Sequence, residues 1–496
     1  MRSAGILLPV TSLPTRGGIG GFSEEAYRFV DFLEQAGQKI WQILPLVPTG
    51  FGDSPYQSVS TFAGNPYMIS LDILRNEGLL TEEECEDADC GENPGYVDYG
   101  RIYRTRWSVL KKAFRRFHPE RDESFGMFLR ENHGWLDEYT LFSAIKESRG
   151  GVQWSEWPEP LRRRDEKALE EIRHSPEIEE EIRFREFLQY EFDRQWKSLK
   201  KYANDHGISI IGDMPIYVAM DSADAWSEPQ LFQFNENLVP ENVAGCPPDD
   251  YAADGQLWGN PLHDWDYQKK TGYGWWIRRM RRAMSLYDVV RIDHFRGFES
   301  YYSIPYGEPT ARNGVWVKGP GLDVFHAIED ALGEIRVIAE DLGYLTENVR
   351  NMVRESGYPG MKVLHFAFGS GPSNEYLPHH YLRNCIVYTG THDNETSRGF
   401  FRTATENERN FCLRYFGCPD CPEEEFADLL VRAALSSVSD TAIIPMQDYL
   451  NLGSEARFNT PSTLGGHNWC WRMLPGQFNG ELAGKIRALT ELYSRI

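Results

Sequence analysis

Short apolar runs recur along this chain and are separated by longer amphipathic segments. Most runs are continuously apolar rather than alternating, which is typical of strands covered on both faces. Eight can be counted, at residues 5–10, 39–46, 208–218, 288–293, 336–341, 361–368, 385–391 and 441–446. Helical periodicity fills several intervals, for example residues 23–37, 346–357 and 422–437. Eight strands that alternate with helices predict an α/β fold, a (β/α)8 TIM barrel, with an open doubly wound sheet as the alternative.

Two intervals are too long for simple connections between strands. Residues 79–200 are charged and helical in pattern, and they predict a helical insertion. Residues 221–274 are rich in Pro, Gly, Asp and Trp, and they predict a loop-rich insertion over the active-site mouth. The barrel strands then come from residues 1–78 (the first two), 201–220 (the third) and 275–496 (the fourth to eighth).

Composition narrows the classes of partner. The net charge of −22 over 496 residues would repel phosphate backbones and anionic membranes, so neither nucleic acid nor a membrane is expected as a partner. No run approaches the ~18 apolar residues of a membrane-spanning helix. The eight cysteines are scattered, which favours reduced thiols in the cytoplasm over a disulfide framework. The Cys418–Cys421 pair has no second pair to complete a zinc site, so it predicts a turn, and no metal is expected.

Four acidic residues close apolar runs: Asp213, Asp293, Glu340 and Asp393. The carboxyl ends of parallel strands meet at the mouth of a barrel, where ligands bind. Each carboxylate alone is as consistent with a helix cap or a surface ion pair. Four of them at matching strand ends instead predict a shared site. Cleaving an acetal requires one group to protonate the leaving oxygen and one carboxylate to meet the anomeric carbon, and a pair on neighbouring strands supplies both.

The roles within this set follow from the neighbouring residues. Arg291 lies two residues before Asp293 on the same face of the strand, so it would keep that carboxylate ionised and nucleophilic. Glu340, packed against other carboxylates, would have a raised pKa and could act as general acid and then as base. Asp393, with His392 beside it, would hold sugar hydroxyls more tightly in the transition state.

The same residues carry a resemblance to known families. GDMPIYV (212–218), RIDHFRGFESYY (291–302), VIAEDLG (337–343) and YTGTHDNET (388–396) resemble the four signature regions of the α-amylase clan. SLPTRGGIG (12–20), GDSPYQSVSTFAGNPY (52–67), GQLWGNPL (255–262), PGMKVLHFAF (359–368), LGSEARFNTP (452–461) and NWCWR (468–472) are similar to glycoside hydrolase family 77, the 4-α-glucanotransferases called amylomaltases or disproportionating enzymes. The resemblance runs from about residue 5 to the end of the sequence.

The resemblance implies an activity and a set of roles. It implies transfer of an α-1,4-glucan segment to the 4-hydroxyl of an acceptor glucan or glucose, by a retaining double displacement without a cofactor. Asp293 would be the nucleophile, Glu340 the acid and base, and Asp393 the transition-state stabiliser. The expected substrate-binding residues are Tyr56, Tyr99, Asp213, Tyr251, Trp258, Asn260, Arg291, His392 and Asn394.

Three departures from the wider clan or the family are visible. Val218 stands where many amylases have a histidine, as in family 77. Only 50 residues follow Met446, too few for the clan's carboxyl-terminal β-domain, so none is expected. Asp250 replaces one of two aromatic residues that the family tends to show after PPD, which leaves acceptor stacking to Tyr251. Trp258 is predicted to lie under an incoming glucose, with simple packing of the insertion against the barrel as the alternative.

Three other functions compete with a transferase. A hydrolase of the same clan would use the same carboxylates with water as acceptor, and the sequence does not separate the two. A magnesium-dependent barrel enzyme would also place acidic residues at strand ends, although Arg291 would repel the metal and no lysine ends a strand as base. A catalytically silent glucan-binding protein is expected to have lost the nucleophile or the acid, and this chain has both.

Overall fold

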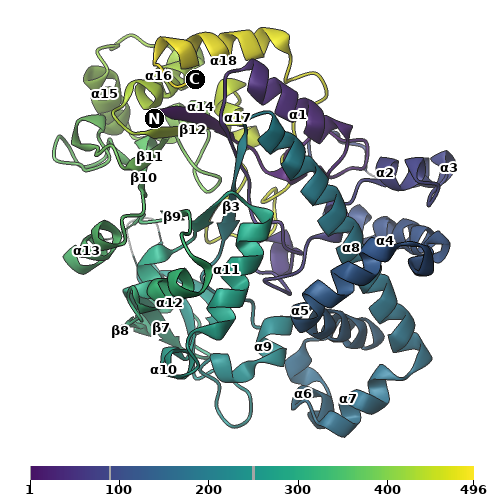
Figure 1. Ribbon diagram of the computed structural model, residues 1–496. Helices are drawn as coiled ribbons and strands as arrows, with labels where there is room; N and C mark the ends of the chain where they lie inside the picture. The colour runs from purple at the N-terminus through teal and green to yellow at the C-terminus, as the bar shows by residue number, and fades with distance from the viewer. Residues whose placement is uncertain (1, 89–90, 249–251, 344) are drawn as a thin grey trace.

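The computed structural model describes residues 2–88, 91–248, 252–343 and 345–496 (Figure 1). Its largest sheet has eight parallel strands in the order β10-β11-β12-β1-β2-β3-β6-β9. The strands are β1 (Ser3–Leu7), β2 (Ile40–Gln42), β3 (Ser209–Met214), β6 (Val289–Ile292), β9 (Val337–Ala339), β10 (Gly360–Val363), β11 (Cys385–Tyr388) and β12 (Thr441–Pro445). Each of the eight predicted runs overlaps one of them, and six runs contain the whole strand; β1 and β10 begin before their runs. The predicted TIM barrel is confirmed.

The barrel closes between β9 and β10, the two ends of this order. No strand pairing joins them among the described residues; the Ala339 N–H instead donates a 3.0 Å hydrogen bond to the carbonyl of Pro359. The Oδ1 of Asp341 accepts a further bond of 2.7 Å from the N–H of Met361. A side chain therefore supplies part of the closing contact that a backbone ladder supplies elsewhere.

Apolar side chains from alternate positions fill the barrel. The interior cluster consists of Leu7, Ile211, Ile338, Met361, Val363, Ile386, Tyr388 and Ile443. Because side chains alternate across a strand, the neighbouring positions face the surrounding helices and join a separate, larger core. Both faces of each strand are thus covered, which accounts for the continuous apolar runs in the sequence.

Helices cover the outside of the barrel. Those between and after the strands are α1 (Glu24–Gln35), α11 (Gly274–Leu286), α12 (Asp323–Leu332), α13 (Glu347–Ser356), α14 (Ser397–Thr403), α15 (Glu406–Tyr415), α16 (Glu423–Ser436), α17 (Met446–Tyr449) and α18 (Gly480–Leu492). The three helices expected from periodicity are α1, α13 and α16. Thr346 caps α13 by accepting from the N–H of Val349, and Gly357 ends it at φ +72°.

The segment between β2 and β3 is helical, as predicted. It holds α2 (Leu71–Asn76), α3 (Glu82–Glu86), α4 (Tyr99–Arg116), α5 (Glu123–Ser148), α6 (Glu159–Arg162), α7 (Glu166–Arg173) and α8 (Pro176–Asp205). Figure 1 shows α4 to α8 grouped to one side of the barrel. The long helix α8 continues to Asp205, where the sequence had placed the insertion's end at residue 200.

A second sheet lies outside the barrel and was not predicted. It has four antiparallel strands in the order β5-β4-β7-β8. They are β4 (Asn242–Cys246), β5 (Gln256–Pro261), β7 (Ser300–Pro305) and β8 (Val315–Lys318), with α9 (Ala223–Ser227) and α10 (Trp265–Lys270) in the same region. The segment expected to be loop-rich thus contributes two strands, which pair with a hairpin that follows β6.

The remaining expectations concern the carboxyl terminus, the cysteines and membranes. Residues 447–496, all of which are described, contain no strand. Cys418 and Cys421 lie in a turn closed by a 3.2 Å bond from the N–H of Cys421 to the carbonyl of Cys418. Within the described ranges, no helix combines the length and apolar character required to span a membrane.

Candidate active site

Three adjacent strands bring the predicted carboxylates to one end of the barrel. Asp213 is the penultimate residue of β3, and Asp293 and Glu340 follow β6 and β9 directly. Asp213 is in register with Arg291, and Ile292 with Ala339, so Asp293 and Glu340 leave their strands at the same level. Asp393 lies further along the chain, in the turn that follows β11.

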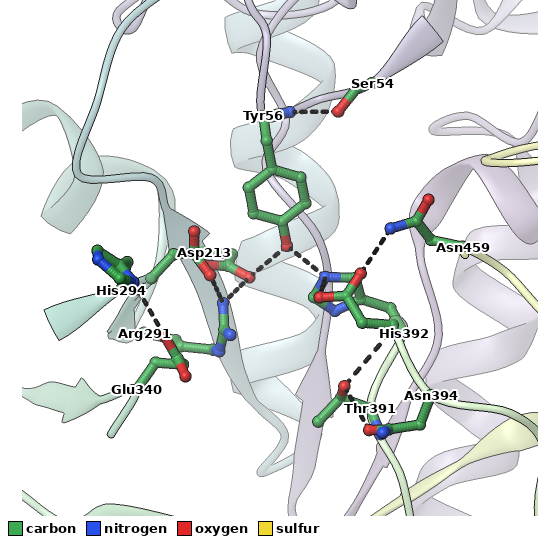
Figure 2. A network of polar contacts seen from close by, with 12 residues as sticks. Ser54, Tyr56, Asp213, Arg291, His294, Glu340, Thr391, His392, Asn394 and Asn459 are labelled. Carbon is green, nitrogen blue, oxygen red and sulfur yellow. Dashed lines mark hydrogen bonds and ion pairs between the residues drawn. The ribbon is translucent and has the colours of Figure 1, made fainter. Parts of the chain in front are cut away.

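Arg291 joins two of these carboxylates. Its Nη1 lies 2.6 Å from Oδ2 of Asp213 (Figure 2). The same nitrogen lies 3.1 Å from Oδ1 of Asp293. The guanidinium side chain is only 4% exposed, whereas the side chain of Asp293 is 28% exposed at the mouth. A buried cation paired in this way fixes the direction of both carboxylates.

Backbone N–H groups hold Glu340. Oε2 accepts a 2.6 Å bond from the N–H of His294, and Oε1 accepts a 2.9 Å bond from the N–H of Leu342. His294 has a left-handed backbone, with φ +50°, which turns its N–H toward the carboxylate. Both oxygens of Glu340 are therefore oriented by main chain, in contrast to the guanidinium contact of Asp293.

Burial and charge act in opposite directions on this pair. Burial raises the pKa of Asp293 well above its usual range, and Arg291 opposes that effect. Burial also raises the pKa of Glu340, again against Arg291 and the two backbone donors. The raised pKa of Glu340 agrees with expectation, but its leading cause is burial rather than neighbouring carboxylates. Arg291 favours the ionised form of Asp293, as expected, but burial acts against it and raises the pKa of the same carboxyl.

Tyr56 connects Asp213 to His392. Its hydroxyl donates a 2.8 Å bond to Oδ2 of Asp213 and lies 3.0 Å from Nε2 of His392. Because the hydroxyl has one hydrogen, and the carboxylate takes it, His392 must donate from Nε2. Burial lowers the pKa of His392, so the ring is neutral. The two rings also stack, with centroids 5.3 Å apart and planes at 13°.

Asp393 is held by a segment from which we had singled out no residue. Asn459 Nδ2 donates a 2.6 Å bond to Oδ1 of Asp393, and Arg457 Nη2 donates a 3.0 Å bond to its carbonyl. His392 Nε2 lies 3.3 Å from Oδ2 of Asp393. Asn459 and Arg457 belong to LGSEARFNTP, and Trp469, whose ring lies 5.7 Å from that of Tyr56, belongs to NWCWR. Both motifs were visible in the sequence.

The other predicted binding residues differ in their surroundings. The ring of Trp258 lies 4.9 Å from that of His294, edge to face, next to the catalytic turn. Asn260 is buried. Its Oδ1 accepts a 3.0 Å hydrogen bond from Nε2 of Gln57, and its Nδ2 donates a 2.7 Å hydrogen bond to the carbonyl of Val218. Asn394 accepts a 2.8 Å bond from the N–H of Thr391. Trp258 thus lies next to the candidate catalytic residues, whereas the hydrogen bonds described for Asn260 and Asn394 are made to other residues of the protein.

One predicted residue is not brought to the centre, and another lies outside the described residues. Tyr99 is buried, and its hydroxyl donates to the carbonyl of Trp469 at 3.3 Å, which places it behind Trp469. Tyr251 and the neighbouring Asp250 lie outside the described residues. Their predicted contacts with an acceptor sugar stay predictions.

The chemistry of the rim does not favour a metal centre. Arg291 stands between Asp213 and Asp293, where a cation bound by both would have to lie. Among the His, Cys, Asp and Glu residues of the described ranges, no group of three or more has an arrangement that could hold an ion. What the geometry offers is a pair of carboxylates at neighbouring strand ends, with hydrogen-bonding side chains around them.

Comparisons with known proteins agree with this chemistry. A profile of the 4-alpha-glucanotransferase family matches residues 8–477. The 4-alpha-glucanotransferase of Clostridium butyricum is 49% identical over 488 residues, covering 98% of this chain and 99% of the relative. That of Thermus thermophilus is 47% identical, covering 100% and 99%. The amylomaltase from Streptococcus agalactiae, solved in complex with acarbose, superposes with a TM-score of 0.96 at 40% identity, covering all of both chains.

Proposed function

The chain belongs to the 4-alpha-glucanotransferase family, glycoside hydrolase family 77, and from this premise we propose how its residues carry out the transfer. The activity itself is that of a 4-alpha-glucanotransferase, an amylomaltase. The proposed substrates are α-1,4-glucans and maltooligosaccharides, which is consistent with the acarbose bound to the S. agalactiae relative. The proposal concerns the role of each residue and the fate of the intermediate.

In the first step Asp293 attacks the anomeric carbon of a bound glucosyl unit, and Glu340 gives its proton to the glycosidic oxygen. The bond to the leaving glucan breaks, and a β-glucosyl ester of Asp293 forms. In the second step Glu340 takes the proton from the 4-hydroxyl of an acceptor, which attacks the same carbon and releases Asp293. Two inversions restore the α configuration.

The observation that carries these roles is the difference between the contacts of the two carboxylates. Asp293 Oδ1 lies 3.1 Å from a guanidinium nitrogen, which favours its ionised form. Burial raises the pKa of both carboxylates, and we assign the proton to Glu340 because the close guanidinium contact is made by Asp293.

Asp393 and His392 form the third part of the mechanism. Positive charge develops at the anomeric carbon in the transition state, and the Asp393 carboxylate would strengthen its bonds to ring hydroxyls at that moment. Neutral His392, with its Nε2–H directed at Tyr56 and Asp393, would donate to a sugar hydroxyl or hold the carboxylate. Asp213 holds the Arg291 guanidinium in place beside Asp293.

Transfer requires that an acceptor sugar outcompete water for the glucosyl enzyme. We propose that the loop-rich insertion, residues 221–274, supplies this preference through Trp258 beside the catalytic turn, while the helical insertion, residues 79–200, supports the opposite side. An apolar ring at the acceptor position excludes water and orients a sugar for attack. We also place the enzyme in the cytoplasm, because its eight cysteines are scattered without the regular spacing of a secreted disulfide scaffold.

Incubation with maltotriose tests the transfer. Glucose and longer oligomers should appear together while the number of reducing ends stays constant, since each cleavage is matched by a new bond. Rising reducing ends would indicate hydrolysis and overturn the proposed fate of the intermediate. A loss of activity on chelation, restored by Mg²⁺, would instead favour the metal-dependent alternative.

A further inference from the structure

The hairpin of β7 and β8 presents an exposed aromatic side chain. Trp316 lies on β8, an edge strand of the antiparallel sheet, and its side chain is 40% exposed. It is directly opposite Tyr302 of β7, so the two rings share a face of the sheet, with centroids 5.1 Å apart and planes at 62°. Tyr302 thus contacts the indole at an angle rather than covering it.

A cation holds the indole from one side. The guanidinium carbon of Arg296 lies 3.8 Å from the centre of the Trp316 ring. Arg296 is itself buried, and its Nη2 donates to Oγ of Ser300 at 3.3 Å. Arg296 thus lies over one face of the ring, and Trp316 still keeps 40% of its surface exposed. The ring is therefore held in one orientation before anything binds to it.

Arg296 links the Trp316 ring to the active site. Arg296 is three residues after Asp293, in the helical turn Phe295–Phe298 that begins beside Glu340. Its guanidinium is close enough to act electrostatically on both His294 and Glu340. One side chain, that of Arg296, thus spans the distance from the catalytic turn to the underside of Trp316.

The surroundings of the ring suit a sugar. Lys318 lies two residues further along β8, on the same face, and its ammonium pairs with Glu299. An aromatic face beside fixed donors and acceptors matches a glucosyl unit, which has apolar C–H faces and a rim of hydroxyls. A partner protein would bury a wider apolar area, yet Val315, the exposed apolar neighbour on this strand, points to the other face.

We propose that Trp316 is a stacking platform for a glucosyl unit of a long α-1,4-glucan whose reacting bond lies between Asp293 and Glu340. The inference rests on the proposed function, because that function supplies the polymeric substrate. A second contact on the same chain acts at high effective concentration, so it strengthens the binding of long glucans and leaves short ones unaffected. The stacked unit is proposed to lie beyond the three glucosyl units of a maltotriose bound across the reacting bond.

The variant W316A tests the platform. With long amylose as donor we expect KM to rise about tenfold, which is a loss of about 1.4 kcal/mol of binding, while kcat stays within about twofold. With maltotriose both constants should be unchanged. W316F keeps a ring and should recover most of the affinity for amylose. V315A, on the same strand but the opposite face, is the matched control and should behave as wild type.

Binding can be followed apart from turnover by electrophoresis in gels that contain amylose. D293N should be retarded by amylose, and the double variant D293N/W316A much less so. The platform would be overturned by unchanged retardation of the double variant or by an unchanged KM of W316A for amylose. Equal losses of activity with amylose and with maltotriose would also overturn it, because they would show that Trp316 acts only through Arg296. A wild-type dimer that W316A dissociates would assign this face to self-association instead. Failure of the wild-type protein to disproportionate maltotriose would refute the proposed function. Binding at the platform is measured separately, by retardation in the amylose gels.

Discussion

Asn459 donates a 2.6 Å hydrogen bond from Nδ2 to Oδ1 of Asp393. The backbone N–H of Asn459 also donates to the carbonyl of His392 at 3.1 Å. Asn459 is thus attached to both residues proposed to act on the sugar ring, through the side chain of Asp393 and the main chain of His392. Asn459 is a positioning residue, because it orients the carboxylate and does not need to touch the reacting atoms.

We predict that N459A lowers kcat about 100-fold with a smaller change in KM, because a misplaced Asp393 loses contacts made mainly in the transition state. N459D should be at least as damaging, since two carboxylates would then face each other. Thr463, exposed on the adjoining loop, provides the control T463A. Steady-state kinetics on maltotriose decide the matter: a kcat for N459A within about twofold of wild type would remove Asn459 from the mechanism.

The two catalytic carboxylates can be separated by the leaving group. D293N and E340Q should each lower turnover of maltotriose by roughly 10⁴-fold or more. A maltosyl fluoride donor loses fluoride without needing a proton, so E340Q should still form a β-maltosyl ester of Asp293, detectable by mass spectrometry of the intact protein. D293N should form none. Covalent labelling of D293N, or near-normal turnover by either variant, contradicts the assigned roles.

Y56F removes one hydroxyl and keeps the ring that stacks on His392. Asp213 then loses a donor and His392 an acceptor, both in a buried setting where an unmet polar group costs about 1–3 kcal/mol. We expect kcat/KM to fall about tenfold to a hundredfold with little change in melting temperature. Y306F, at an exposed tyrosine, is the matched control. An unchanged kcat/KM in Y56F would show that the link from Asp213 to His392 is dispensable.

His365 predicts a pH dependence of stability. Burial lowers its pKa to about 3, against 6.5 for an ordinary histidine. Above pH 6.5 neither state binds the proton. As the pH falls from 6.5 toward 3, the unfolded chain binds a proton that the folded protein excludes, so this residue reduces the free energy of unfolding by about 1.4 kcal/mol per pH unit.

The variant H365F keeps an aromatic ring against Phe400, on which His365 stacks with centroids 4.6 Å apart. It loses the 3.2 Å contact of Nε2 with Ser397, at a cost of about 1 kcal/mol at pH 7. Its unfolding free energy should therefore start lower at pH 7 and fall less steeply below pH 6.5. Urea unfolding at several pH values measures the slopes; parallel curves for the two proteins would refute the titration of His365.

The barrel could be predicted from the sequence because its strands are buried on both faces. Such strands are continuously apolar, and the eight runs stand out among charged helices. The outer sheet could not be found in this way. β4 and β5 lie among turn residues, β8 is largely exposed, and none of them has the apolar run of a barrel strand. Their pairing with β7 depends on segments brought together only by the folded barrel.

The catalytic residues were predictable because a carboxylate after a buried strand is costly without a function. Their supporting residues were harder. Asn459 and Arg457 act from a loop whose place depends on the whole fold, and a lone asparagine has no pattern of its own. Tyr99 is a related case: its contact with a ligand stays a prediction, and in the structure its hydroxyl donates to the carbonyl of Trp469. A side chain's partners, unlike its type, are set by tertiary contacts.

The shared guanidinium of Arg291 has a thermodynamic consequence. Four acidic side chains, Asp213, Asp293, Glu340 and Asp393, surround this one cation, so the rim holds more negative charge than it neutralises. A glucan is uncharged, and by displacing solvent from the mouth it makes that excess harder to sustain, so at a pH where Glu340 is partly ionised the protein takes up hydrogen ions from the medium as it binds. Calorimetric heats of association measured in Tris and in phosphate will consequently differ in proportion to the ionisation enthalpies of the two buffers.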